Sequence, residues 1–81
     1  DKGLIAKNVN WVSIKPPKEK LKVSAKIRYN APEFPATVVP QKEGEVKVEF
    51  AEKQRAVTPG QSVVFYDDEL VLGGGIIQTD I

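Results

Sequence analysis

The 81-residue sequence contains no cysteine and no histidine. Without cysteine it has no disulfide, no thiolate metal site and no thiol nucleophile, and without histidine it lacks the commonest general base and zinc ligand. No stretch approaches the roughly 20 apolar residues that a membrane-spanning helix needs, and residues 1–3 do not open a signal peptide. We therefore expect no catalytic, cofactor-binding or metal-binding residues, a cytoplasmic location and no membrane partner.

Length and composition indicate one small folded domain over residues 1–81. Apolar residues make up 41% of the chain and charged residues 28%, which is ordinary for a globular domain. A chain of this size buries only about 60–65% of the surface that its unfolded form exposes. We expect a domain that folds alone with modest stability.

The net charge of +1 hides an uneven distribution along the chain. Residues 1–30 carry eight lysines and arginines against two acidic residues, whereas the remainder carries four basic residues against nine acidic ones. A basic region of this kind can bind a polyanion, because lysine and arginine release counterions when they neutralise phosphates. It can equally be the solvated face of a strand.

Apolar and polar residues alternate with the period of two that is typical of half-buried strands. The clearest case is residues 21–29, where the apolar side chains face one way and Lys22, Ser24, Lys26 and Arg28 face the other. Further strands are expected at residues 4–12, 36–39, 45–50, 62–66 and 70–77. No window has the spacing of an amphipathic helix. The pattern predicts an all-β fold, a small six-stranded antiparallel barrel, because closure removes the unpaired edges that an open sandwich would leave.

Prolines and glycines mark the expected connections. Pro16-Pro17 and residues 31–35 are predicted to be loops, since proline is excluded from central strands. Residues 42–44 form a predicted hairpin turn. Pro59-Gly60 suits the central positions of a type II turn, which needs a positive φ at its third residue.

Three features invite a chemical assignment, and each has a simpler explanation. Residues 73–75 are three glycines, but no Gly-Lys-Ser/Thr follows them, so a bulge or close backbone approach, within the barrel or to a neighbouring domain, is favoured over a phosphate loop. The acidic residues 67–69 are typical of a solvated hairpin turn. Most of the aromatic residues are expected in the core, and only Trp11 and Tyr29 are left open as base-stacking candidates.

A series of short motifs resembles the C-terminal part of the bacterial tRNA-specific 2-thiouridylases. In order along the chain, the motifs are NW at 10–11, AKIRY at 25–29, PATV at 35–38, VKVEF at 46–50, QRAVTPGQ at 54–61, VFYD at 64–67 and LGGGII at 72–77. The ordered series covers almost the whole chain. The resemblance implies a translation-factor-like β-barrel that lacks catalytic residues and helps to hold tRNA.

The resemblance also implies the properties of a longer parent enzyme. Members of the family use ATP to adenylate the wobble uridine of certain tRNAs and then deliver sulfur to its 2-position from a cysteine persulfide. Their catalytic residues and ATP site lie in the N-terminal domain. The implied partners are therefore tRNA, the N-terminal catalytic domain of the same chain and a sulfur-donor protein, and ATP is a cofactor of the parent only.

The family's tRNA contacts correspond to Arg28, Tyr29 and Gln61 in this sequence, and all three residue types are intact. Lys22 and Lys26 share the basic face with Arg28, so we add them to the expected RNA-binding residues. Asn30 stands where many relatives carry another basic residue, and the loss of that charge affects the expected strength of phosphate binding. Two alternatives stay open: a structural barrel that packs on the catalytic domain through residues 70–77, and a free-standing barrel that binds a protein or small ligand.

Overall fold

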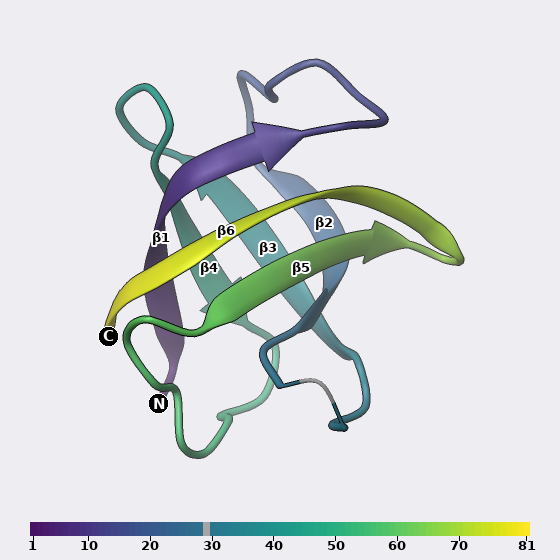
Figure 1. Ribbon diagram of the computed structural model, residues 1–81. Coiled ribbons are helices and arrows are strands. Elements are labelled where there is room, and N and C mark those ends of the chain that lie inside the picture. Colours follow the sequence, from purple (N-terminus) through teal and green to yellow (C-terminus); the bar gives the residue numbers. More distant parts are fainter. Residues whose placement is uncertain (29) are drawn as a thin grey trace.

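The computed structural model describes residues 1–28 and 30–81 and contains six strands (Figure 1). They are β1 (Gly3–Trp11), β2 (Leu21–Lys26), β3 (Phe34–Pro40), β4 (Val46–Phe50), β5 (Ser62–Asp67) and β6 (Leu70–Asp80). Among the described residues, no helix is present that could cross a membrane.

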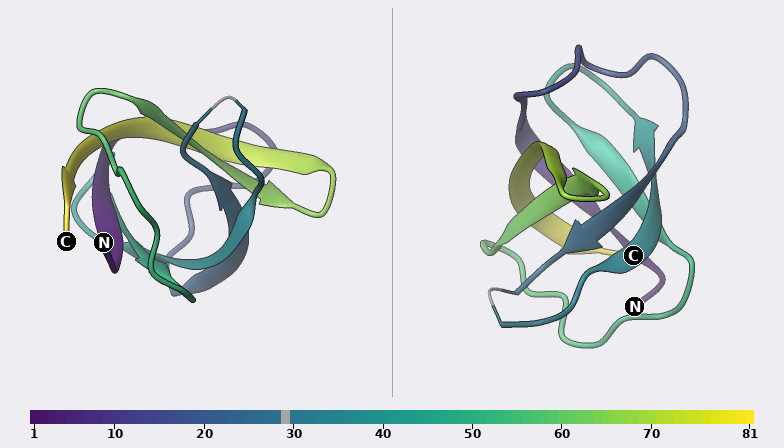
Figure 2. Two further views of the ribbon diagram at one scale, coloured as in Figure 1. Left: turned by 90° about the horizontal axis from the view of Figure 1, so that it is seen from below. Right: turned by 90° about the vertical axis from the view of Figure 1, so that its right-hand side faces the viewer.

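The strands form one closed barrel in the order β1-β4-β3-β2-β5-β6, with β6 pairing back onto β1. Every pairing is antiparallel. The view from below shows the strands arranged around a central space (Figure 2, left). The predicted all-β fold, a closed six-stranded antiparallel barrel, is confirmed.

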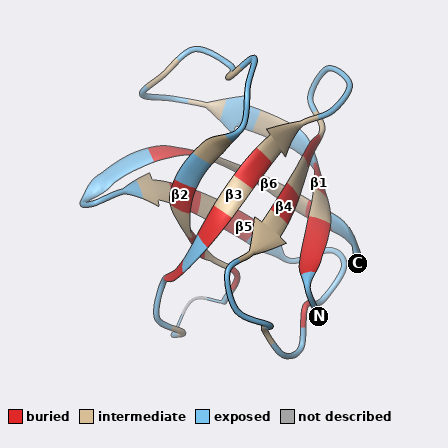
Figure 3. Ribbon diagram, turned by 180° about the vertical axis from the view of Figure 1, so that it is seen from behind, coloured by how far each residue is buried: buried red, intermediate tan, exposed pale blue. Residues whose placement is uncertain are grey.

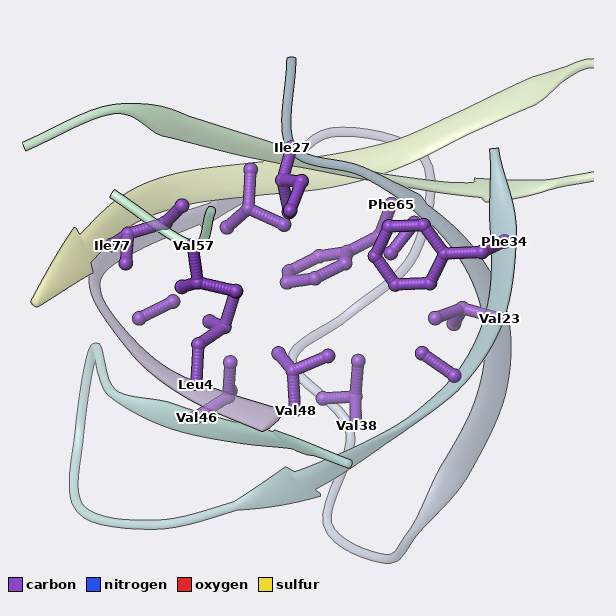
Figure 4. Close-up of a cluster of buried hydrophobic side chains, with 14 of the residues drawn as sticks. Leu4, Val23, Ile27, Phe34, Val38, Val46, Val48, Val57, Phe65 and Ile77 are labelled. Atoms are coloured by element: carbon purple, nitrogen blue, oxygen red, sulfur yellow. The ribbon is translucent and has the colours of Figure 1, made fainter. Parts of the chain in front are cut away.

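The core lies inside the barrel and is formed by the side chains of alternate residues along the strands. Buried and less buried positions alternate along β3 and β4 (Figure 3), as the period-two pattern predicts. Val38, Val48 and Phe65 are completely buried in the centre. Val57 comes from the loop between β4 and β5 and also turns its side chain into this cluster (Figure 4). Each such side chain stabilises the fold by about 1.5–3 kcal/mol.

The three glycines of β6 permit close backbone approach within the barrel. Gly73 lies opposite Trp11 in β1 and opposite Phe65 in β5. The two rings stack across it, with their centroids 5.5 Å apart and their planes at 21°. A Cβ atom on Gly73 would collide with the carbonyl oxygen of Asn10 and lie 3.0 Å from Cε3 of the Trp11 ring. Trp11, left open from the sequence, therefore packs against the core.

Strand boundaries differ from the sequence prediction, notably at the end of β2 and the start of β3. The basic strand was expected to run to residue 29, but β2 ends at Lys26, where its pairing with Val64 of β5 also ends. Residues 34 and 35 were expected in a loop, yet both belong to β3. Pro35 is tolerated because the ladder between β3 and β4 begins only at Ala36, and the carbonyl of Pro35 accepts a bond from the Ala51 N–H at 3.1 Å.

The last strand is longer than predicted. β6 continues beyond residue 77 to Asp80, because residues 79 and 80 pair with Ile5 and Leu4 of β1. The apolar pattern in the sequence ends at residue 77, whereas the pairing with β1 continues to Asp80.

The stacked pair makes Gly73→Ala a specific test of the closure. We expect the added methyl group to lower the free energy of unfolding by about 1–3 kcal/mol, because it overpacks the contact with Asn10 and Trp11. Urea unfolding measures the loss, and the emission of the single tryptophan should shift as its ring leaves Phe65. Gly44→Ala is the control: it places an alanine at φ 75° with no atom within 4 Å of the new Cβ. It should cost about 1 kcal/mol and leave the emission unchanged.

Candidate nucleic-acid interface

A groove opens on the outside of the barrel where β2 and β5 part. The two strands pair only from Ser24–Tyr66 to Lys26–Val64. Beyond this point the chain continues as Ile27 and Arg28 on one side, while β5 is preceded by Gln61 on the other. The groove has a volume of about 410 Å³ and is lined by Lys26, Ile27, Arg28, Gln61, Ser62, Val64 and Tyr66.

The groove brings together three of the five residues that the sequence predicts to bind RNA. Lys26, Arg28 and Gln61 all line it, although Gln61 is far from the other two in the sequence. Lys22 is exposed on β2 opposite Thr37 and does not line the groove. Tyr29 falls outside the described residues. The site residues remain predictions, but Lys26, Arg28 and Gln61 share one surface.

Arg28 is held by the loop between β4 and β5. Its Nη1 and Nη2 atoms donate hydrogen bonds to the carbonyl oxygen of Arg55, at 3.3 and 2.9 Å. Each Nη atom carries a second N–H, so this contact orients the guanidinium group without using all of its donors. Arg28 is exposed, and its charge is therefore available at the surface.

The loop that carries the Arg55 carbonyl is fixed to the barrel on its other side. Val57, two residues further on, is buried in the core, and its N–H donates to Oδ2 of Asp1 at 3.3 Å. Ala56 between them has a left-handed backbone with φ 56°. The barrel interior thus restrains the loop, and the loop restrains Arg28.

Gln61 follows a rigid turn. The Gln61 N–H donates to the Thr58 carbonyl at 3.1 Å, and Gly60 has φ 93°, as a type II turn requires. The turn is tied to β6 in both directions, because the N–H of Gly60 donates to the carbonyl of Ile77 and the N–H of Ile77 donates to the carbonyl of Gln61, each at 2.8 Å. The predicted type II turn is confirmed, and it presents the exposed Gln61 side chain beside the groove.

Sequence reasoning missed Tyr66, which was counted among the core aromatics. In the structure Val63 and Phe65 are buried inside the barrel, so Val64 and Tyr66 face outward from β5 and line the groove. The signal was present in the sequence, since alternation around Phe65 places its neighbour Tyr66 on the opposite face.

The remaining polar features lie in turns. Residues 67–69 are exposed at the tip of the β5–β6 hairpin, with φ 56° at Asp68, so the predicted solvated turn is confirmed. In the part of the chain that the structure describes, no polar or charged residue is buried and no three acidic side chains gather as a metal site. The groove offers charged and hydrogen-bonding groups that suit the binding of a polyanion.

Comparison with known proteins identifies the family of this chain. Residues 1–77 match the model of the aminomethyltransferase β-barrel domain. The chain belongs to this family. It is 61% identical over 77 residues to the tRNA-specific 2-thiouridylase MnmA of Halothermothrix orenii, and 55% identical over 78 residues to the protein of the same name from Clostridium beijerinckii. The corresponding protein of Acetivibrio thermocellus is 54% identical over 77 residues.

These matches cover 95%, 96% and 95% of this chain but only 22%, 22% and 21% of the three relatives. The chain therefore spans about a fifth of their length. The similarity to 2-thiouridylases that the sequence motifs predict is confirmed. The activity named for the relatives belongs to much longer proteins.

Gly60→Val tests the turn that presents Gln61. No atom lies within 4 Å of the new Cβ, so we expect the main effect to be backbone strain at φ 93°. We expect the free energy of unfolding to fall by more than about 1 kcal/mol in a urea titration. Gly60→Asn is the matched control, since asparagine tolerates positive φ better, and it should lose less. Equal losses for the two variants would contradict the proposed turn geometry.

Proposed function

We propose that this chain is the tRNA-positioning C-terminal domain of an ATP-dependent tRNA 2-thiouridylase. The observation that carries the proposal is the convergence of Lys26, Arg28 and Gln61 on one groove of a barrel whose relatives are named tRNA-specific 2-thiouridylases. The barrel itself holds the RNA, and the chemistry takes place in the rest of the parent protein.

The groove residues divide the binding between charge and hydrogen bonding. Arg28 and Lys26 neutralise phosphates, and the planar guanidinium group of Arg28 can donate two parallel bonds to one phosphate. Gln61 presents an amide to a sugar or phosphate from a turn that is already ordered, so little entropy is lost on binding. Lys22 extends the basic side of β2 beyond the groove and adds a longer-range attraction.

The parent enzyme supplies the remaining parts of the reaction. In this proposal its N-terminal domain binds ATP, adenylates the wobble uridine and receives sulfur from a donor protein, in the cytoplasm where tRNA is modified. The barrel contributes no group to the chemical steps. Its effect is to hold the tRNA so that the uridine reaches the catalytic domain.

Arg28→Gln in the full-length parent tests the role of the groove in binding. Glutamine keeps an N–H donor on a shorter side chain, so the variant removes the charge and leaves a polar group at the position. We expect the dissociation constant for tRNA to rise roughly tenfold or more. A filter-binding titration at several salt concentrations should also show a salt slope that is smaller by about one unit.

Lys42→Gln provides the matched control for this experiment. Lys42 lies in the hairpin between β3 and β4, away from the groove residues, and its side chain is 80% exposed. The substitution removes the same charge from the domain and should change neither the affinity nor the slope appreciably. If Arg28→Gln and Lys42→Gln behave alike, the groove does not bind phosphate and the proposal fails.

A second candidate function, packing on the rest of the parent chain, is favoured by an apolar patch. Val12, Leu70 and Val71 are 63%, 52% and 42% exposed. They are held close together, because the N–H of Val12 donates to the Leu72 carbonyl at 2.9 Å and Oγ of Ser13 donates to the Val71 carbonyl at 2.6 Å. Large apolar residues that are exposed in one region of a surface are typical of interaction sites. The patch borders the groove, because Val71 lies opposite Tyr66 in the β5–β6 hairpin.

Leu70→Lys separates the two surfaces. In the isolated barrel the change should be within about 0.5 kcal/mol of neutral, since Leu70 is already exposed. In the full-length parent we expect faster protease cleavage on the N-terminal side of the barrel, because a charge placed in the interface loosens the domain contact. Protease sensitivity that matches the unmodified parent would show that the patch is not covered by the rest of the chain.

A further inference from the structure

Tyr66 is an aromatic residue on the outer surface of the barrel. Its strand neighbour Phe65 is completely buried, and Tyr66 itself is half-buried and lines the groove together with Val64. Among the described residues the ring contacts are Trp11–Phe65 and Phe34–Phe50, and Tyr66 takes part in neither. Its ring is therefore not a member of the two aromatic pairs that pack at the core.

The surroundings of Tyr66 leave an apolar wall beside a basic rim. Ser24, a small residue, lies opposite Tyr66 on β2, and Lys26 lies opposite Val64. On the other side of β5, Val64 faces Gly74, which has no side chain to cover it. One wall of the groove is thus the outward side of Val64 and Tyr66, and its rim carries Lys26 and Arg28.

An aromatic ring beside basic side chains is suited to binding a nucleotide. An aromatic ring on the face of a sheet stacks on the π-face of a base, and neighbouring lysine and arginine side chains hold the adjacent phosphates. A base in a double helix has its faces covered by its neighbours and cannot stack in this way. Only an unstacked nucleotide presents both a free base face and a flexible backbone.

We infer that Tyr66 is a stacking platform for an unpaired nucleotide of the tRNA, with Lys26 and Arg28 binding its flanking phosphates. The inference rests on the proposed function and adds to it the class of RNA that the groove accepts. Tyr66 is then a positioning residue: it holds single-stranded RNA against the barrel and takes no part in the thiolation chemistry.

The test compares Tyr66→Leu, Tyr66→Phe and Arg28→Gln in the full-length parent, with tRNA as the probe at several salt concentrations. Tyr66→Leu should raise the dissociation constant about 5-fold to 100-fold and leave the salt slope unchanged, since stacking involves no counterion release. Tyr66→Phe keeps the ring and should bind as the parent does. The affinity for an unstructured RNA oligonucleotide, relative to a blunt RNA duplex of equal length, should fall in Tyr66→Leu only.

The outcomes distinguish this inference from the proposed function. If Tyr66→Leu binds tRNA normally while Arg28→Gln binds weakly with a reduced slope, the stacking role is overturned and the phosphate-binding groove stands. If neither variant changes binding, both fail. Thermal unfolding shows whether Tyr66→Leu remains folded. If Tyr66→Leu is unfolded, Tyr66→Trp is tested instead. Equal or tighter tRNA binding by Tyr66→Trp supports the stacking role, and weaker binding by the folded variant overturns it.

Discussion

Closure of the sheet through β6 is the constraint on which the other features of this barrel depend. β6 pairs with β1 on one edge and β5 on the other, and the backbones approach so closely at Gly73 that a side chain there would meet Asn10 and Trp11. The empty position lets the rings of Trp11 and Phe65 meet across the strand, which restores apolar contact where the glycine supplies none. A six-stranded sheet without this closure would expose two edges.

The closed barrel leaves its outer surface free to vary without disturbing the core. Because side chains alternate along each strand, Lys26, Val64 and Tyr66 project from the face opposite the buried cluster, whereas Ile27 lines the groove and also belongs to the cluster. The exception is Arg28, which is exposed but also holds the loop of Arg55, and that loop sends Val57 into the core. In the proposed function binding and folding are therefore connected at Arg28, because its guanidinium group bonds to the Arg55 carbonyl and is also the expected contact for RNA phosphates.

Two surfaces of different chemistry occupy the barrel wall. The groove between β2 and β5 is basic on its rim, and the patch around Val12 and Leu70 is apolar and lies beside the acidic tip of the β5–β6 hairpin. In the proposed function the groove contacts RNA and the patch contacts protein, and the two surfaces meet at Tyr66 and Val71. Such an arrangement suits a module that holds a substrate next to a catalytic domain.

The sequence by itself determined the number of strands, most of their inward faces and the turns, since alternation and the conformations of glycine and proline act over a few neighbouring residues. It also indicated the basic strand and, through the resemblance, Gln61. Only the tertiary structure decided that Lys26, Arg28 and Gln61 share a groove, that Lys22 lies outside it, that Pro35 fits in a strand and that Tyr66 forms a wall. These features arise where segments distant in sequence pair or part, and no local pattern records which strand lies beside which.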